Sequence, residues 1–316
     1  MMASGCATSM RCAATRTIGI SGQMLAGALV VTHAISGIGT RGFGKRASTT
    51  PASSAKKEGH VPREPEDAAG GAATKKVLVF GGSGYVGRRV CQSLIALAAR
   101  DKVQVTSVSR SGCFSPVSSS DVRWVEQVEW MRADAAAALV DQDAGETAAI
   151  QTAMRDADAV VSCIGAFGSD SFMQRMNGDV NIALARTFAA TTARAAPRFV
   201  FVSTAPFRFP GVVLRGYFNG KKRAEDAALE CFGDNATILR PSFVHGTRDV
   251  PGNIRLPLGL VGRPLEAAAS MVLPSLSPIS VDDVGKAAAV AALGGDLLDN
   301  TSIWEYEQMT GAAGRA

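Results

Sequence analysis

The sequence predicts an α/β protein: a doubly wound parallel sheet with helices on both faces, followed by a small irregular C-terminal lobe. Two observations predict this class. From residue 75 onward, short apolar runs of strand type alternate with amphipathic helical stretches, which is typical of parallel sheets that are covered on both faces. The first run, VLVF at 77–80, breaks into glycines at Gly81, Gly84 and Gly87 before a helical pattern begins.

The elements follow one another in order along the chain. A Ser-rich loop at 111–120 interrupts the pattern, and a further strand is expected within 122–134, ending before Asp134. After residue 246 the pattern is less regular, with an apolar, proline-bearing stretch at 256–280 and a short WEYEQM segment at 304–309. The other predicted strands are 77–80, 103–110, 159–167, 198–207 and 235–246, and the predicted helices are 87–100, 146–157, 177–195, 221–232 and 281–293.

The N-terminal 57 residues have a different composition from the rest. They are rich in Ala, Ser, Thr and Gly and contain seven Lys or Arg but no Asp or Glu, which is typical of an organelle transit peptide. The uncharged stretch 17–40 leaves a membrane anchor as the alternative. Arg41-Gly42-Phe43 resembles a mitochondrial processing site, so we expect a mitochondrial protein, with the plastid as the alternative. The expected domains are a transit peptide (1–57), a disordered linker (58–74), a dinucleotide-binding domain (75–245) and a C-terminal lobe completing a substrate pocket (246–316).

The net charge and the cysteine and histidine content bear on nucleic-acid binding, disulfides and metal sites. The formal net charge is +5, from 33 basic and 28 acidic residues, but without the seven N-terminal cations the body carries 26 basic residues and is close to −2. The body therefore has no basic bias towards nucleic acid. The six cysteines include no C-x-x-C pair and there are only three histidines, so we expect neither a disulfide framework nor a metal site.

The glycine turn predicts a cradle for the diphosphate of a dinucleotide. Gly81 permits a tight turn, Gly84 lets the backbone approach the phosphates, and Gly87 lets the new helix pack closely on the sheet. The free amides and the dipole of that helix then face the anion. A glycine triplet can also be an ordinary turn or helix cap.

Two residues at later strand ends concern the adenosine half of the cofactor. Arg110 ends the second strand, where an arginine pairs with the 2′-phosphate of NADP, whereas an acid would bind the 2′-hydroxyl of NAD. We therefore expect NADP(H) rather than NAD(H); the alternative is a solvated arginine. Asp134 is expected either to accept from the adenine amino group or to cap the helix that begins at 135.

Candidate catalytic residues lie after the strand at 198–202. Ser203 ends this strand, and Tyr217 and Lys221 follow at i and i+4 positions, which share one face of a helix. We expect Lys221, with a nicotinamide cation, to lower the pKa of Tyr217 so that its hydroxyl can exchange a proton with a substrate oxygen. Lys221 would also bind the nicotinamide ribose, and Ser203 would hold the substrate carbonyl. The alternative is an ordinary half-exposed helical pair.

With these residues placed, the chain resembles an atypical branch of the short-chain dehydrogenase/reductase family, which has the Rossmann fold. The resemblance covers about residues 75–310 and rests on the G-x-x-G-x-x-G turn and on SVSRSG, VSCIGAFG, MNGDVN, GYFNGKKRAE, LRPSFVHGTR and PLGLVGRPLE. Plant organellar NAD(P)-binding proteins and the fungal mitochondrial subunit of the coenzyme Q biosynthesis complex are similar, and the 39 kDa accessory subunit of respiratory complex I is related.

The resemblance also implies site residues. Pro241, Ser242 and Phe243 would flank the nicotinamide. One departure is CIGAFG, where many members have an Asn-Ala-Gly turn, and Asn177 and Asn181 are the candidates to replace the asparagine of the usual catalytic tetrad. The implied cofactor contacts are Gly81, Gly84, Tyr85, Val86, Gly87, Ser109, Arg110, Cys163, Ile164 and Gly165.

Three functions follow as hypotheses. The first is an organellar NADP(H)-binding protein that supports ubiquinone or another isoprenoid-quinone pathway, through assembly of the biosynthetic complex. The second is an active NADPH-dependent reductase of a small or lipid-like carbonyl substrate. The third is a non-catalytic subunit of a respiratory complex. The apolar stretch 256–276 is expected either to receive a polyprenyl quinone or the inner membrane surface, or to pack as core.

Overall fold

The computed structural model describes residues 73–98, 102–114, 119–206, 214–250, 254–257, 277–294 and 302–316. They all belong to one compact unit that spans residues 71–316. The expected transit peptide (1–57) and nearly all of the expected linker (58–74) lie outside the described residues.

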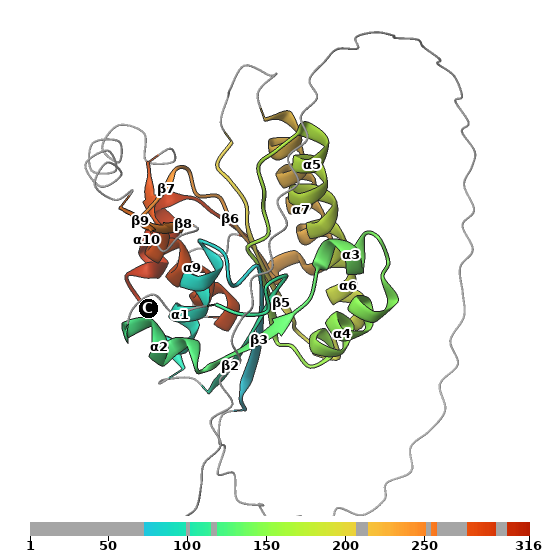
Figure 1. Cartoon of the computed structure of the whole chain (residues 1–316), viewed down its shortest axis with the longest axis horizontal. Helices are drawn as coiled ribbons and strands as arrows, with labels where there is room; N and C mark the ends of the chain where they lie inside the picture. Colours follow the sequence, from blue (N-terminus) through green and yellow to red (C-terminus); the bar gives the residue numbers. More distant parts are fainter. Residues whose placement is uncertain are drawn as a thin grey trace, which may run out of the picture. The chain divides into compact units, whose positions relative to one another are not determined.

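A seven-stranded sheet forms the centre of this unit (Figure 1), with the strand order β11-β6-β5-β4-β1-β2-β3. All neighbouring strands pair in parallel. The order reverses between β1 and β4, the switch point beside which doubly wound sheets bind ligands at the carboxyl ends of their strands. The strands are β1 (Lys75–Phe80), β2 (Val103–Ser109), β3 (Val128–Arg132), β4 (Ala159–Ser162), β5 (Arg198–Val202), β6 (Ala236–Leu239) and β11 (Ile303–Trp304).

The central strands are apolar because both of their faces are covered. Every residue of β4 and β6 is buried, as are the last four of β1 and of β5. Strands that are buried on both sides read as continuous apolar runs rather than as an alternation of apolar and polar residues. The doubly wound α/β class is therefore confirmed.

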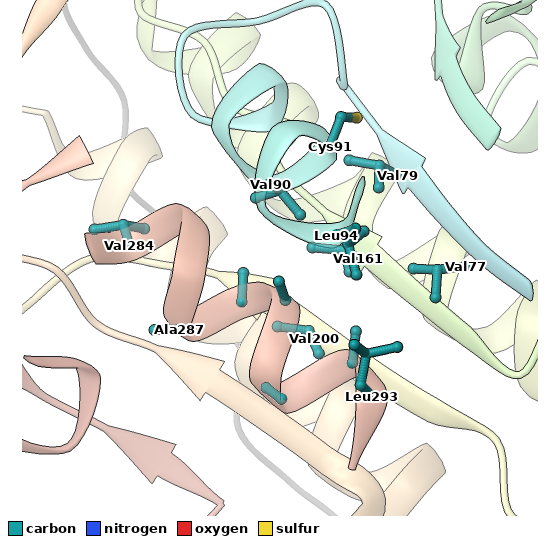
Figure 2. Packing of buried hydrophobic residues seen from close by; sticks show 14 of the residues in the cluster. Val77, Val79, Val90, Cys91, Leu94, Val161, Val200, Val284, Ala287 and Leu293 are labelled. Atoms are coloured by element: carbon teal, nitrogen blue, oxygen red, sulfur yellow. The ribbon is translucent and has the colours of Figure 1, made fainter. Parts of the chain in front are cut away.

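One layer of helices packs on the first face of the sheet. Val90 and Leu94 of α1 meet Val284 and Ala287 of α9 over the sheet valines, among them Val79 (Figure 2). The helices on this side in Figure 1 are α1 (Gly87–Leu97), α2 (Ser119–Val125), α9 (Val281–Leu293) and α10 (Tyr306–Ala313).

A second layer covers the other face, on the opposite side of the sheet in Figure 1. Its core is built from larger side chains, including three phenylalanines. The Phe232 ring is stacked on both Phe188 and Phe199. The elements of this layer are α3 (Ala135–Leu139), α4 (Ala144–Arg155), α5 (Asp170–Gln174), the π-helical turn η1 (Arg175–Asp179), α6 (Val180–Thr191), α7 (Arg215–Phe232) and the 3-10 turn η2 (Gly233–Asn235).

Two elements that follow residue 246 join the main sheet and its core. Helix α9 lies in the main core and β11 extends the main sheet next to β6. Between them lie two small pairs, the parallel β7 (Val244–His245) with β10 (Ile279–Ser280) and the antiparallel β8 (Thr247–Val250) with β9 (Ile254–Pro257). Helix α9 packs closely on α1 through its small residues, because a β-carbon on Gly285 would lie 2.7 Å from Arg89.

The segments 122–134 and 256–276 were also part of the sequence predictions. The segment 122–134 divides between the end of helix α2 and strand β3 rather than forming a strand alone. The apolar stretch 256–276 lies outside the described residues except for the end of β9. Among the helices that are described, none combines the length and hydropathy that crossing a membrane requires.

Candidate functional site: a dinucleotide cavity at the switch point

The glycine turn after β1 is closed by its own backbone. Gly81 has φ +78°, and its amide donates to the Val108 carbonyl at 2.8 Å, while the Gly84 amide donates to the Gly81 carbonyl at 2.9 Å. A β-carbon on Gly87 would lie 2.2 Å from that same Gly81 oxygen. The turn therefore needs glycine at 81 for its conformation and at 87 for space, as the sequence predicts.

The N-terminus of the helix that follows is held by its own backbone, where the Arg88 and Arg89 amides donate to the Gly84 and Val86 carbonyls at 3.1 and 2.9 Å. No side chain caps α1 at Val86, and the first turn contains no acidic residue. The first amides of a helix have no partner within the helix, and its dipole places partial positive charge there. Uncapped and free of carboxylates, this end fits a phosphate group.

A cavity of about 560 Å³ lies against the glycine turn, at the carboxyl ends of β1, β2 and β4 and the start of α3. This is within the range of small-molecule sites. Eight of the predicted cofactor residues line it: Gly81, Gly84, Ser109, Arg110, Asp134, Cys163, Ile164 and Gly165.

The cavity also has walls that the sequence predictions missed. Ser83 and Ser111 line it, and their hydroxyls are 3.2 Å apart; Ser111 Oγ is also 3.2 Å from Ser109 Oγ. Ser111 directly follows Arg110, so the motif SVSRSG could have indicated it. Met176 and Phe172, from η1 and α5, close the opposite wall; nothing in their local sequence distinguishes them from core residues.

Arg110 and Asp134 both lie at this cavity. The Arg110 side chain is exposed at the end of β2. Asp134 Oδ1 accepts from the Ala136 amide at 2.9 Å and from the Ala137 amide at 3.4 Å, so the helix-cap alternative is confirmed for this residue. Its position in the cavity wall leaves an adenine contact as a proposal.

The loop between β4 and α5 is fastened by two buried asparagines. Asn177 Nδ2 donates to the Ala166 carbonyl at 2.8 Å and its Oδ1 accepts from the Ala166 amide at 3.2 Å. Asn181 Oδ1 accepts from Ser162 Oγ at 2.5 Å. Asn177 lies in the π-helical turn η1, an irregularity that is frequent at functional sites. Both amides therefore hold the loop that carries Cys163, Ile164 and Gly165.

Ser203 does not face this cavity. Its hydroxyl donates at 2.6 Å to Glu225, a carboxylate that is only 3% exposed and is also held by two hydrogen bonds from Arg240. The Ser203 hydroxyl is thus engaged by the buried Glu225 carboxylate, and its expected role towards a substrate carbonyl stays a prediction. The neighbouring Thr204 hydroxyl donates to the Ala205 carbonyl at 3.4 Å, and it also lowers the pKa of Tyr217.

Burial raises the pKa of Tyr217; the lowering expected from Lys221 together with a nicotinamide cation stays a prediction. The Thr204 hydroxyl opposes the effect of burial. The Tyr217 ring is stacked on Phe167, with ring centroids 4.8 Å apart and planes at 14°. An apolar neighbour of this kind disfavours the charged phenolate.

Lys221 is buried between two strand ends. Its Nζ donates to the Val202 carbonyl at 2.7 Å and to the Ile164 carbonyl at 3.2 Å, and lies 4.6 Å from the centre of the Phe201 ring. Burial lowers the pKa of Lys221 to about 8, opposed by Cys163 and Glu225. Lys221 therefore joins the ends of β4 and β5 directly behind Gly165, whose β-carbon would lie 3.5 Å from Nζ.

Six of the predicted cofactor residues do not line the cavity: Gly87 of the glycine turn and the five that follow. Tyr85 and Val86 belong to the turn before α1, and Tyr85 packs next to Gly246. After β6, the Pro241 carbonyl accepts from the Ala205 amide, Ser242 donates to the Ser277 carbonyl, and Phe243 is 54% exposed. None of these five lines the cavity.

The described part of the chain contains thiols but no disulfide. Its four cysteines, Cys91, Cys113, Cys163 and Cys231, are free thiols. Burial raises the pKa of Cys163 to about 12, opposed by Lys221. No three His, Cys, Asp or Glu side chains of these residues gather closely enough to hold a metal ion.

A parallel sheet with a glycine turn, an uncapped helix and a cavity at the switch point defines a Rossmann-type dinucleotide-binding protein. A family model described as NAD(P)H-binding matches residues 81–259. An uncharacterised chloroplastic protein of Arabidopsis thaliana is 32% identical over 266 residues, which cover 79% of this chain and 81% of that protein. The chain therefore belongs to the NAD(P)H-binding family.

Two further proteins are similar over a shorter stretch of the chain or at a lower sequence identity. MIOREX complex component 2 of Saccharomyces cerevisiae is 44% identical over 61 residues, which are 19% of this chain and 20% of that protein. A short-chain type dehydrogenase/reductase from Mycobacterium ulcerans has a TM-score of 0.50 at 17% identity, covering 74% of this chain and 90% of that one. That structure supports the fold alone.

Proposed function

We propose that this protein binds NADP(H) in preference to NAD(H). The observation that carries the preference is Arg110, exposed at the end of β2 in the cavity wall beside the hydroxyls of Ser109 and Ser111. A guanidinium with neighbouring hydroxyl donors suits a 2′-phosphate dianion, and no carboxylate follows β2 at the position where NAD enzymes bind the ribose. Gly81, Gly84 and the start of α1 would hold the diphosphate. When bound, NADPH supplies a hydride.

We further propose that the protein acts in an organelle, the mitochondrion first and the plastid as the alternative, in support of isoprenoid-quinone biosynthesis or assembly of its complex. The acid-free N-terminal 57 residues support an organellar address. A relative named as chloroplastic supports the organellar address, and another named as a component of a complex supports a role within an assembly. The pKa of Tyr217 is raised, and the ring of Phe167 covers it. Both features favour a protein that binds NADPH over one that turns it over.

An active reductase is the second candidate. The Thr204 hydroxyl, which lowers the pKa of Tyr217, supports it, with Lys221 four residues further on α7. In this version Tyr217 gives the proton to a carbonyl oxygen and Thr204 orients the phenol. NADPH oxidation in the presence of quinone precursors tests it, with Tyr217→Phe as the variant that loses turnover and keeps NADPH affinity.

The test of the first proposal is the composition of protein recovered from its own cells. Full-length tagged protein is isolated without added nucleotide, its small-molecule content is resolved between NAD and NADP, and the proteins that accompany it are identified. We expect NADP(H) together with quinone-biosynthesis proteins. Recovery with respiratory-complex subunits instead would support a non-catalytic subunit, and NAD(H) alone would contradict the preference.

A further inference from the structure

Two exposed phenylalanines lie on the segment that follows β4. Phe167 is 68% exposed and Phe172 is 43% exposed, two of the four large apolar side chains that are exposed among the described residues. Exposed rings that gather at a cavity rim, rather than singly on a surface, indicate a binding surface.

Phe167 is half of a ring pair. One face of its ring stacks on Tyr217, whose other contact is the edge of Phe218 at 5.3 Å and 90°. Because most of the Phe167 side chain is still exposed, its second face is open. A second flat ring can therefore extend the stack.

Phe172 connects this ring pair to the dinucleotide cavity. A β-carbon on Gly168 would lie 2.8 Å from the Phe172 ring, so this ring lies directly beside the residue that follows Phe167. Phe172 also forms part of the cavity wall. The aromatic surface and the cavity are therefore continuous.

Both supports of the stack are fixed. Asn177 holds the Ala166 backbone by two hydrogen bonds, immediately before Phe167. Asp170 Oδ1 accepts from the Gly216 amide at 2.6 Å, immediately before Tyr217. Rings that are held before a ligand arrives lose little entropy when it binds.

Two of the charged groups near the stack, Asp170 and Lys221, are already engaged. Asp170 is bound to Gly216, and the Lys221 ammonium is bound to the carbonyls of Ile164 and Val202. A ligand ring at this surface therefore meets π-faces and no open charge from these two groups. The surface suits an uncharged planar ring.

We propose that Phe167, Phe172 and Tyr217 form a stacking site for an uncharged planar aromatic or quinone-type ring, adjoining the dinucleotide cavity. This deepens the proposed function and rests on it, since it names the class of a second ligand. Geometry of this kind adds specificity for flat rings over saturated ones of the same size.

The experiment measures the affinity of two probes for the protein loaded with NADPH. The flat probe is 2-naphthol, and the saturated probe of the same ring number is 2-decalol. In Phe167→Leu we expect 2-naphthol to bind about two- to tenfold more weakly, and 2-decalol to be unaffected. Val122→Ala is the control, an exposed apolar side chain on α2 outside the cavity wall, and should change neither probe.

Failure of this site and failure of the proposed function give different results. NADPH affinity is measured on the same samples; NADPH binding without 2-naphthol binding, or equal 2-naphthol binding by Phe167→Leu, overturns the stacking site alone. Absence of NADPH binding overturns the function. Phe172→Leu repeats the test from the other ring, and a dimer that disappears in Phe167→Leu would assign the surface to a second copy and overturn the ligand.

Discussion

Gly87 and Gly81 are in such close contact that a β-carbon on Gly87 would lie 2.2 Å from the Gly81 carbonyl oxygen. That oxygen already accepts from the Gly84 amide, which closes the turn. The first turn of α1 is therefore pressed against the loop that would carry the diphosphate. Two glycines, which have no functional side chain, therefore fix the geometry of the cradle through their backbones.

Gly87→Ala should disrupt this cradle. The oxygen it would displace belongs to the backbone, so we expect the unfolding free energy to fall by about 1–3 kcal/mol and NADPH affinity to fall by at least about tenfold. Urea unfolding and calorimetric titration measure the two effects. Gly145→Ala is the matched control, since its β-carbon would meet only Asp143 Oδ1 at 3.5 Å; equal losses in both variants would refute the contact.

Arg110→Gln should change the choice of dinucleotide. Loss of charge-assisted hydrogen bonds is expected to weaken NADPH binding by about ten- to hundredfold, while NADH affinity stays the same because NADH has no 2′-phosphate. Arg123→Gln removes an exposed charge on α2 and should leave both affinities unchanged. A parallel fall in NADPH and NADH affinity for Arg110→Gln would mean that Arg110 does not read the 2′-phosphate.

Ser203→Ala and Thr204→Val should separate two adjacent hydroxyls. Ser203→Ala removes a hydrogen bond to the buried Glu225 carboxylate and should lower the unfolding free energy by about 1–3 kcal/mol. Thr204→Val should raise the pKa of Tyr217 further, because the Thr204 hydroxyl opposes the effect of burial. Ultraviolet titration of the three tyrosines measures it, and a shift seen only in Ser203→Ala would contradict the role of Thr204.

Lys221 should make stability depend on pH in the alkaline range. Burial lowers its folded pKa from 10.5 to about 8, so between these values the unfolded chain binds more protons than the folded chain. Stability contributed by this group therefore rises with pH through that window, by at most about 3 kcal/mol. Below pH 8 the full cost of burying the charged form is present.

The measurement compares urea unfolding of the natural chain and of Lys221→Met from pH 7 to pH 10. Subtracting the variant removes most of the contribution of the cysteines, whose raised pKa values act in the opposite direction. The natural chain should gain stability relative to Lys221→Met as the pH rises. A constant or declining difference would show that Lys221 stays protonated in the folded state.

The sheet and the glycine turn were predictable because their signals are local. Apolar runs such as AVVS and the spacing of Gly81, Gly84 and Gly87 determine strand and turn without reference to distant residues. The place of α9 in the main core was not predictable, because its alanine-rich pattern shows that one face is buried but not which core buries it.

The site was predictable at its glycines and strand ends, and less so at its hydroxyls. Ser203 and Thr204 are neighbours at the end of β5, and successive side chains of an extended chain point to opposite sides. Sequence alone therefore does not decide which of them meets Tyr217. Phe167 lies on the loop after β4 and Phe172 on the short helix α5, and their residue types do not encode the chain path that brings both to the site.

The most direct test of the account is a titration of nucleotide-free protein with NADPH and with NADH. We expect one dinucleotide bound per chain, with NADPH bound more tightly than NADH. NADPH binding should be lost in Gly87→Ala but not in Gly145→Ala. Protein that is folded yet binds neither dinucleotide would contradict the assignment of the cavity at the glycine turn.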